Sequence, residues 1–211
     1  MTDRLSLYNG ALRLVGESRL TSLTEAAEKC RLLDDAWDDN AIRYCLEQGY
    51  WWFATRASRF DPDPDFTASF GYQYGYEKPT DWIRTAGTWA DDRGNVPLTR
   101  IRDEAGYWFA DVEPIYISYI SSDVRYGMNL ANWPETFTQY VESYLAFLIA
   151  PKLTNDLNRV AMVEKLMSKR RVDARSKAAM NEAAGVLPMG SWTASRMRRI
   201  GSDNARGRLI G

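Results

Sequence analysis

Apolar residues recur at helical spacing along the first quarter of the chain. Leu5, Tyr8, Leu12 and Val15 are three or four positions apart, which predicts a helix over 4–15 that Gly16 ends. A longer helix is predicted from about 25 to 48, because Ser22 and Glu25 form a capping-box pattern. The apolar stripe of that helix is Ala26, Cys30, Leu33, Trp37, Ala41 and Tyr44, and its acidic side is Glu28, Asp34, Asp35, Asp38, Asp39 and Glu47.

The middle of the chain changes to short runs of apolar residues between turn signals. Strands are predicted over 82–85, 97–102, 107–110 and 115–120, with turns at 91–95 and 104–106. Their close and regular spacing predicts an antiparallel meander.

Helical spacing returns after this stretch. Asn132 is the predicted N-cap of a helix that Pro151 is expected to kink or end, and its stripe is Phe137, Val141, Tyr144 and Leu148. Another helix is predicted from about 155 to 184. Its first half is apolar on one face (Leu157, Val160, Ala161 and Leu166), whereas its second half is polar nearly all round. We expect that half to project into solvent or to pack on a partner.

These patterns together predict an α+β fold with three parts. Residues 1–59 and 126–185 form a helical bundle, and residues 60–125 form a β-rich insertion with a small antiparallel sheet. Residues 186–211 are glycine-dotted and basic without periodicity, which predicts an extended basic C-terminal arm that becomes ordered on a partner.

Composition removes several classes of chemistry. The 211 residues are 45% hydrophobic, enough for a real core, and include no histidine. A Ser-His-Asp triad, a Cys-His pair and a His-ligated zinc site are therefore excluded. The two cysteines, Cys30 and Cys45, are expected to be buried reduced thiols, and no stretch is long and apolar enough to predict a membrane span.

Charge is distributed unevenly along the chain. Residues 152–211 contain 13 basic and 5 acidic residues, whereas residues 1–151 contain 14 basic and 23 acidic ones. This asymmetry indicates that the C-terminal part binds something acidic, namely nucleic acid, a membrane surface or an acidic protein.

Two clusters of aspartates are candidate metal ligands. The i, i+4 spacing of Asp34, Asp35, Asp38 and Asp39 is compatible with a divalent metal pair, as in two-metal nucleases, but a solvated acidic helix face is the favoured interpretation. The loop with Asp61, Asp63 and Asp65 lacks the glycine and the terminal glutamate of a calcium hand. We therefore assign no catalytic, metal or cofactor-binding residue and expect no cofactor.

Aromatic and arginine residues give the remaining candidates. Stacking on nucleobases and anchoring a core or interface are both open to the aromatics, and the second is favoured for Trp37, Trp51, Trp52, Phe53 and Phe137. The arm places apolar anchors among arginines, a composition typical of interfaces, although an inert tail is the alternative. The arm residues concerned are Trp192, Arg196, Met197, Arg198, Arg199, Ile200, Arg206 and Arg208.

The order of several short motifs resembles a known family. The motifs are Ala11-Leu-Arg-Leu-Val-Gly, Leu20-Thr-Ser-Leu, Trp51-Trp-Phe-Ala-Thr-Arg-Ala, Gly71-Tyr-Gln-Tyr-Gly-Tyr-Glu-Lys-Pro-Thr-Asp-Trp-Ile-Arg and Trp133-Pro-Glu-Thr-Phe. Over about residues 5–185 this order resembles the phage head-to-tail adaptors of the tail tubular protein A type.

The resemblance implies a non-enzymatic virion protein at the portal vertex, present in the host cytoplasm before assembly. Its members form a ring, usually a dodecamer, that binds the portal protein above and the tail nozzle or tube protein below, while genomic DNA passes through the lumen. Here the C-terminal arm, with Arg170 and Arg171 of the preceding helix, would dock on the portal. The alternative functions are a nucleic-acid-binding or metal-dependent nuclease module and a soluble host interaction protein.

Overall fold

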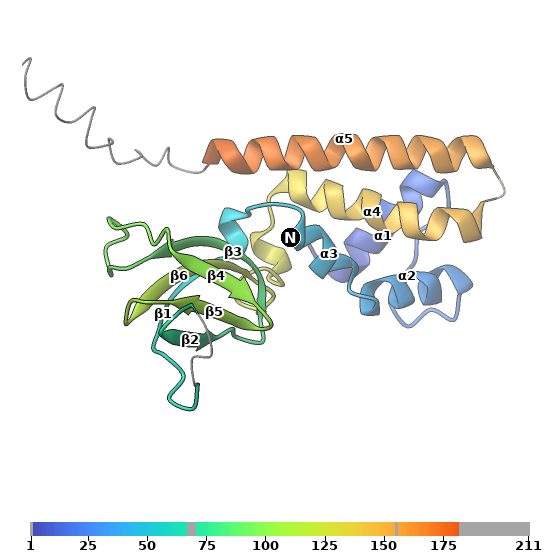
Figure 1. Cartoon of the computed structure of the whole chain (residues 1–211). Coiled ribbons are helices and arrows are strands. Elements are labelled where there is room, and N and C mark those ends of the chain that lie inside the picture. Colours follow the sequence, from blue (N-terminus) through green and yellow to red (C-terminus); the bar gives the residue numbers. More distant parts are fainter. Residues whose placement is uncertain (1, 67–70, 155, 182–211) are drawn as a thin grey trace, which may run out of the picture. The chain divides into compact units, whose positions relative to one another are not determined.

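The computed structural model of the chain describes residues 2–66, 71–154 and 156–181. These residues form five α-helices, two short 3₁₀ helices and six β-strands (Figure 1). The helices are α1 (Arg4–Val15), α2 (Glu28–Asp38), α3 (Ala41–Glu47), η1 (Trp52–Ala54), η2 (Leu130–Asn132), α4 (Glu135–Leu153) and α5 (Leu157–Asn181). The strands are β1 (Thr55–Phe60), β2 (Tyr74–Glu77), β3 (Trp82–Trp89), β4 (Ile101–Glu104), β5 (Tyr107–Ala110) and β6 (Ile115–Ser121). The predicted arm over 186–211 lies outside the described residues.

Helix α1 has the bounds that the sequence predicts. The Asp3 carboxylate accepts a hydrogen bond from the Ser6 backbone N–H at 2.7 Å, and the Ser6 hydroxyl accepts one from the Asp3 N–H at 3.0 Å. This reciprocal cap fixes the start of the helix. Gly16 ends it in the left-handed conformation, with φ of 86°.

The single helix predicted from about 25 to 48 is wrong, because the segment forms two helices. Asn40 adopts the left-handed conformation, with φ of 65°, and separates α2 from α3. Asparagine tolerates this conformation better than most residues, so the change of direction occurs there. The segment also becomes helical later than predicted. Glu25 accepts hydrogen bonds from Thr21 instead of forming a capping box with Ser22, and α2 begins at Glu28.

The boundaries of α4 also differ from the prediction. Pro134, rather than Asn132, is the N-cap, and Asn132 ends the short helix η2. The helix continues through Pro151 to Leu153, so Pro151 does not end it. One lost backbone hydrogen bond in the last turn is tolerated because the end of the helix is near.

The face of α5 that packs on the bundle overlaps the predicted face only in part, since Val160 is half-buried against the core. The buried residues are Val163, Ala174 and Ala178, whereas the predicted Leu157 is 83% exposed. The expectation that the second half cannot be buried is also wrong, because the small side chains of Ala174 and Ala178 bring the polar half against the bundle core.

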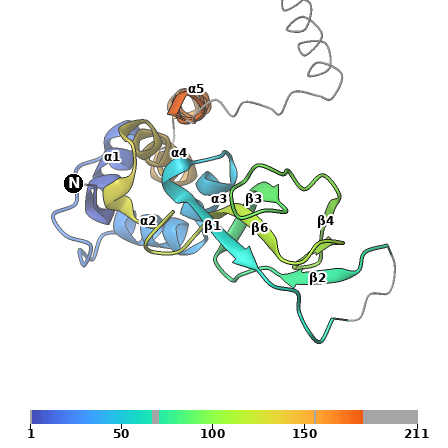
Figure 2. The ribbon, with the colours of Figure 1, turned by 90° about the vertical axis from the view of Figure 1, so that its left-hand side faces the viewer.

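Helix α4 is the centre of the bundle. It contacts α1, α2, α3 and α5, and Figures 1 and 2 both show it between α5 on one side and α2 on the other. The largest completely buried side chains of this core are Trp51, Tyr8, Tyr140, Phe137, Leu7, Leu12, Leu33, Ile42 and Leu46.

The strands form two antiparallel three-stranded sheets rather than the predicted meander. The strand orders are β1-β6-β3 and β2-β5-β4. Because β3 pairs with β6 and not with β4, only β4 and β5 are consecutive strands that pair with each other. The predicted strand over 97–102 is displaced to β4, while Pro97 forms an isolated bridge with Trp89. Ala105 and Gly106, both with positive φ, make the predicted turn between β4 and β5.

Strand β6 joins the two halves of the fold. Ile115 and Ile117 belong to a small core between the sheets with Tyr76 and Trp108, whereas Ile120 belongs to the core of the bundle. Helices and strands are thus parts of one mixed α+β architecture, and the predicted fold class is confirmed.

Candidate functional site

The residues predicted to dock on a portal fall into two groups. Those of the arm lie outside the described residues, so their role stays a prediction: Trp192, Arg196, Met197, Arg198, Arg199, Ile200, Arg206 and Arg208. Arg170 and Arg171 lie on α5 and are half-buried.

Arg170 is engaged within the bundle. Its Nη1 donates a hydrogen bond to the backbone carbonyl of Gln139 in α4 at 3.0 Å. Burial lowers the pKa of Arg170, and the carboxylate of Glu142 opposes that effect. The guanidinium therefore helps to hold α5 on α4, and a partner that bound it would compete with this contact.

Several large apolar side chains are exposed on α5. Leu157, Met162, Val172 and Met180 are 83%, 58%, 61% and 73% exposed. Helical geometry places them away from the buried face of Val163, Ala174 and Ala178. Lys165 and Lys169 are exposed between them. We call this set the outward face of α5, and exposed apolar side chains among cations are typical of an interaction surface.

The predicted aromatic anchors have different environments. Trp51 and Phe137 are buried with ring centroids 4.7 Å apart, and the Trp51 indole N–H donates to the carbonyl of Leu46 at 2.9 Å. Phe53 packs on the same rings. Trp37 is half-buried beside Tyr8, whereas Trp52 is 50% exposed.

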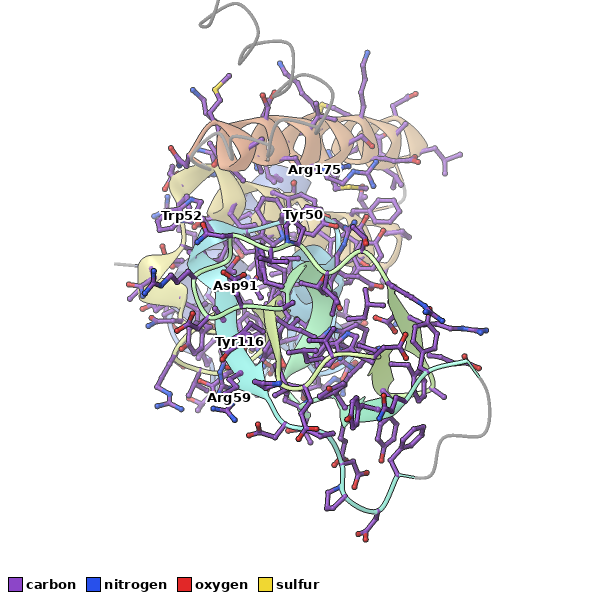
Figure 3. All side chains as sticks on the ribbon, turned by 60° about the vertical axis from the view of Figure 1, so that its left-hand side comes forward. Tyr50, Trp52, Arg59, Asp91, Tyr116 and Arg175 are labelled. Atoms are coloured by element: carbon purple, nitrogen blue, oxygen red, sulfur yellow. The ribbon has the colours of Figure 1, made fainter. Side chains whose placement is uncertain are left out.

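Trp52 belongs to an aromatic corner with Tyr50, which is 44% exposed. The Arg84 guanidinium lies 4.2 Å from the centre of the Tyr50 ring, and its Nη1 donates to the carbonyl of Glu47 at 3.3 Å. Figure 3 shows Tyr50 and Trp52 below Arg175 of α5. Gly49 leaves room for the Trp51 indole, because a Cβ there would be 2.9 Å from that ring, and the Arg175 side chain lies at ordinary contact distance on the same side.

The sheet β1-β6-β3 has an open hollow of about 420 Å³ on its surface. Its lining includes Arg59, Trp89, Asp91 and Tyr116, and Figure 3 shows Asp91, Tyr116 and Arg59 in succession along that side. The charged groups already have structural partners. Arg59 pairs with Asp61 at 2.6 Å, and the backbone N–H groups of the turn, Val96 first, hold the pKa of Asp91 below its usual range.

The aspartates considered as metal ligands are dispersed or engaged. Asp34 accepts hydrogen bonds from Arg4 at 2.6 Å and from the Tyr8 hydroxyl at 2.9 Å. Asp63 accepts one from the Tyr107 hydroxyl at 3.0 Å. Over residues 2–66, 71–154 and 156–181, no three acidic or cysteine side chains are grouped in a way that could hold a metal ion.

Sequence reasoning missed two buried acidic groups. Asp81 accepts hydrogen bonds from Tyr119 and Ser121 and forms an ion pair with Arg56 at 3.1 Å. Glu142 of α4 is 12% exposed in its side chain and lies 3.7 Å from Arg13, and burial raises its pKa. Only the tertiary neighbours distinguish these two residues from the many surface carboxylates.

Glu142 also explains a glycine in α1. A Cβ at Gly10 would be 2.1 Å from the Glu142 carboxylate, so that a larger residue would collide with it. Glu142 Oε2 has no hydrogen-bond partner within the described part of the chain. Both residues border a hollow with Ser6, Asn9, Arg13 and Arg19.

None of the described helices is both long and apolar enough to cross a membrane. Comparison with known proteins finds no family model that matches the chain and no curated protein that matches it.

Proposed function

We propose that this chain is a structural, non-enzymatic subunit of a phage head-to-tail connector. Copies of it form a ring, a dodecamer in our proposal, between the portal protein and the tail nozzle or tube protein, and genomic DNA passes through the lumen. The protein acts in the virion and is present in the host cytoplasm before assembly. The observation that carries the proposal is the outward face of α5, where four large apolar side chains are more than half exposed. A protein that works alone has little use for such a face.

The motifs that resemble the adaptor family supply a second line of support. They lie where helices and strands begin or contact one another, and they do not form a reactive site. The run from Gly71 to Arg84 covers β2 and the start of β3 and includes Asp81. The run from Trp133 to Phe137 starts α4, and the Trp133 indole N–H donates to the carbonyl of Gly127 at 2.8 Å. A shared architecture is the simplest reason for such motifs to recur in order.

The test is co-sedimentation of the protein with its cognate portal ring. The full-length chain and a chain that ends at Ala184 are compared, with a non-cognate portal ring as the control. We expect the full-length chain to sediment with the portal in near-equimolar amounts. The shortened chain should not bind and should stay in the supernatant. Binding by both would keep the adaptor function but move docking to α5. Binding by neither would overturn the proposal.

The nucleic-acid or nuclease alternative has the basic α5 in its favour. It predicts salt-dependent DNA binding, or Mg²⁺-dependent cleavage that Asp38→Asn abolishes. Fluorescence anisotropy with a labelled duplex and a nicking assay measure both. A flat response in the two assays removes this alternative without affecting the connector proposal.

A further inference from the structure

The outward face of α5 is basic as well as apolar. Between Leu157 and Asn181 the helix has seven Lys or Arg residues and two acidic ones, and two of the seven, Arg159 and Arg170, donate hydrogen bonds to backbone carbonyls of the bundle. Lys165 and Lys169 lie on the exposed side, near Met162 and Val172. A partner for this face must offer apolar contacts and negative charge together.

The chain itself offers a surface of that kind. An open hollow of about 230 Å³ lies between α2, α3 and α4, with Leu32, Tyr144 and Leu148 among its lining and Asp35 and Asp39 at its edge. Leu148 is 37% exposed there, and Lys152 is the cation of the lining. We call this the acidic hollow.

Charge over the helices that form this hollow has the opposite sign to that of α5. Residues 28–47 have six acidic and three basic side chains. One of the six, Asp34, is neutralised by Arg4. Asp35 and Asp39 remain exposed, so both charge and apolar character match the outward face of α5.

The two surfaces lie on opposite sides of the bundle. Figures 1 and 2 agree in showing α5 on one side of α4 and α2 on the other. Complementary surfaces on opposite sides of one subunit produce a head-to-tail contact, which closes into a ring when the rotation between neighbours permits.

We infer that the outward face of α5 docks into the acidic hollow of a second copy of this chain. The inference deepens the proposed function and rests on it, since it names the two surfaces through which ring neighbours meet. Nucleic acid is the weaker candidate for α5, because phosphates offer no apolar contact to Met162 and Val172, whereas the acidic hollow includes Leu32, Tyr144 and Leu148.

The test uses two full-length variants with reversed charge. Variant A has Lys165→Glu and Lys169→Glu, and variant B has Asp35→Lys and Asp39→Lys. Each variant alone places like charges across every contact, so we expect its self-association to weaken about tenfold or more. A mixture of A and B places opposite charges at every contact if the copies alternate, so that assembly should return in the mixture.

Assembly is measured by sedimentation velocity over a range of protein concentrations, with and without the portal ring. The controls are Arg93→Glu and Asp92→Lys, which reverse a charge of the same sign at one position each on the exposed turn between β3 and β4. Circular dichroism establishes that A and B are folded. Recovery in the mixture but in neither variant alone supports the inference.

Four outcomes overturn it. Variant B assembling like the native chain would indicate that α5 faces α5, and a native chain that stays monomeric in every condition would remove the contact. Loss of DNA binding in variant A with normal assembly would make nucleic acid the occupant of α5. Portal binding that persists while both variants assemble normally would retain the connector function and reject only these surfaces. Self-association through these surfaces without portal binding would support the inferred contact and reject the connector function.

Discussion

The helical bundle and the β-rich part are stabilised in different ways. The bundle has one large apolar core around α4, in which Trp51, Phe137 and Tyr140 are completely enclosed. The β-rich part has a core of Tyr76, Trp108, Ala110, Ile115 and Ile117. A core of that size leaves a larger share of stability to polar contacts.

A few charged side chains make many of these polar contacts. Asp81 joins β1 and β6 through Arg56, Tyr119 and Ser121. Lys78 is 6% exposed, forms an ion pair with Asp103 and lies 3.9 Å from the centre of the Trp82 ring. The bundle therefore depends mainly on buried apolar area, whereas the β-rich part depends more on ion pairs and hydrogen bonds of charged side chains. The two parts should respond differently to mutation.

Truncation of Phe137 to alanine is expected to have the largest effect. Its ring contacts Trp51, Phe53 and Trp133 at centroid distances of 4.7, 4.9 and 4.9 Å. We expect Phe137→Ala to destabilise the protein by about 3–5 kcal/mol. Urea unfolding followed by circular dichroism measures this loss. The control is Trp52→Ala, a half-exposed aromatic that should cost much less, and equal losses would contradict a core centred on Phe137.

Removal of the Asp81 charge tests the β-rich part. Asp81→Asn keeps the shape but weakens the bonds to Arg56, Tyr119 and Ser121, for an expected loss of about 1–3 kcal/mol. Asp92→Asn on the exposed turn is the control.

The thiol of Cys45 reports where this loss occurs. Cys45 is completely buried in the bundle, and burial raises its pKa, so it should be inert to maleimide while the bundle is folded. Peptide mass spectrometry should find Cys45 still protected in Asp81→Asn under conditions that loosen the strands. Simultaneous loss of protection would show that the two parts unfold as one.

Local signals explain which elements were predictable. Helix α1 has its apolar spacing, its cap at Asp3 and its ending at Gly16 within a few residues, and its bounds were predicted. The break at Asn40 leaves the apolar spacing unchanged, so the pattern suggested one helix. Strand β1 has no apolar alternation, because Arg56 and Arg59 serve polar contacts, and it was missed.

Tertiary context explains what the sequence could not supply for the candidate site. Acidic residues at helical spacing suggested Asp34 and its neighbours, but Asp34 is occupied by Arg4 and Tyr8. The polar second half of α5 indicated a partner, and the structure adds that Ala174 and Ala178 face the bundle. Because the alanines of α5 face the bundle, the opposite face of this helix is the one available to another molecule.

The smallest expected effect concerns Glu142, the charged exception within the apolar bundle. Because burial raises the pKa of Glu142 above its value in the unfolded chain, folding favours the protonated side chain. This contribution is present at low pH and is lost as the pH rises through the folded-state pKa. Glu142→Gln removes the charge and should stabilise the protein at neutral pH by about 1 kcal/mol.

Urea unfolding at several pH values measures the difference between Glu142→Gln and the native chain. The advantage of the variant should shrink as the pH falls towards about 4, where an ordinary glutamate is half protonated. Glu164→Gln on the exposed side of α5 is the control and should show no such dependence. If Glu142→Gln were instead less stable at neutral pH, the attraction of Arg13 and Arg170 would exceed the cost of burial. The bundle would then share the reliance on charge that distinguishes the β-rich part.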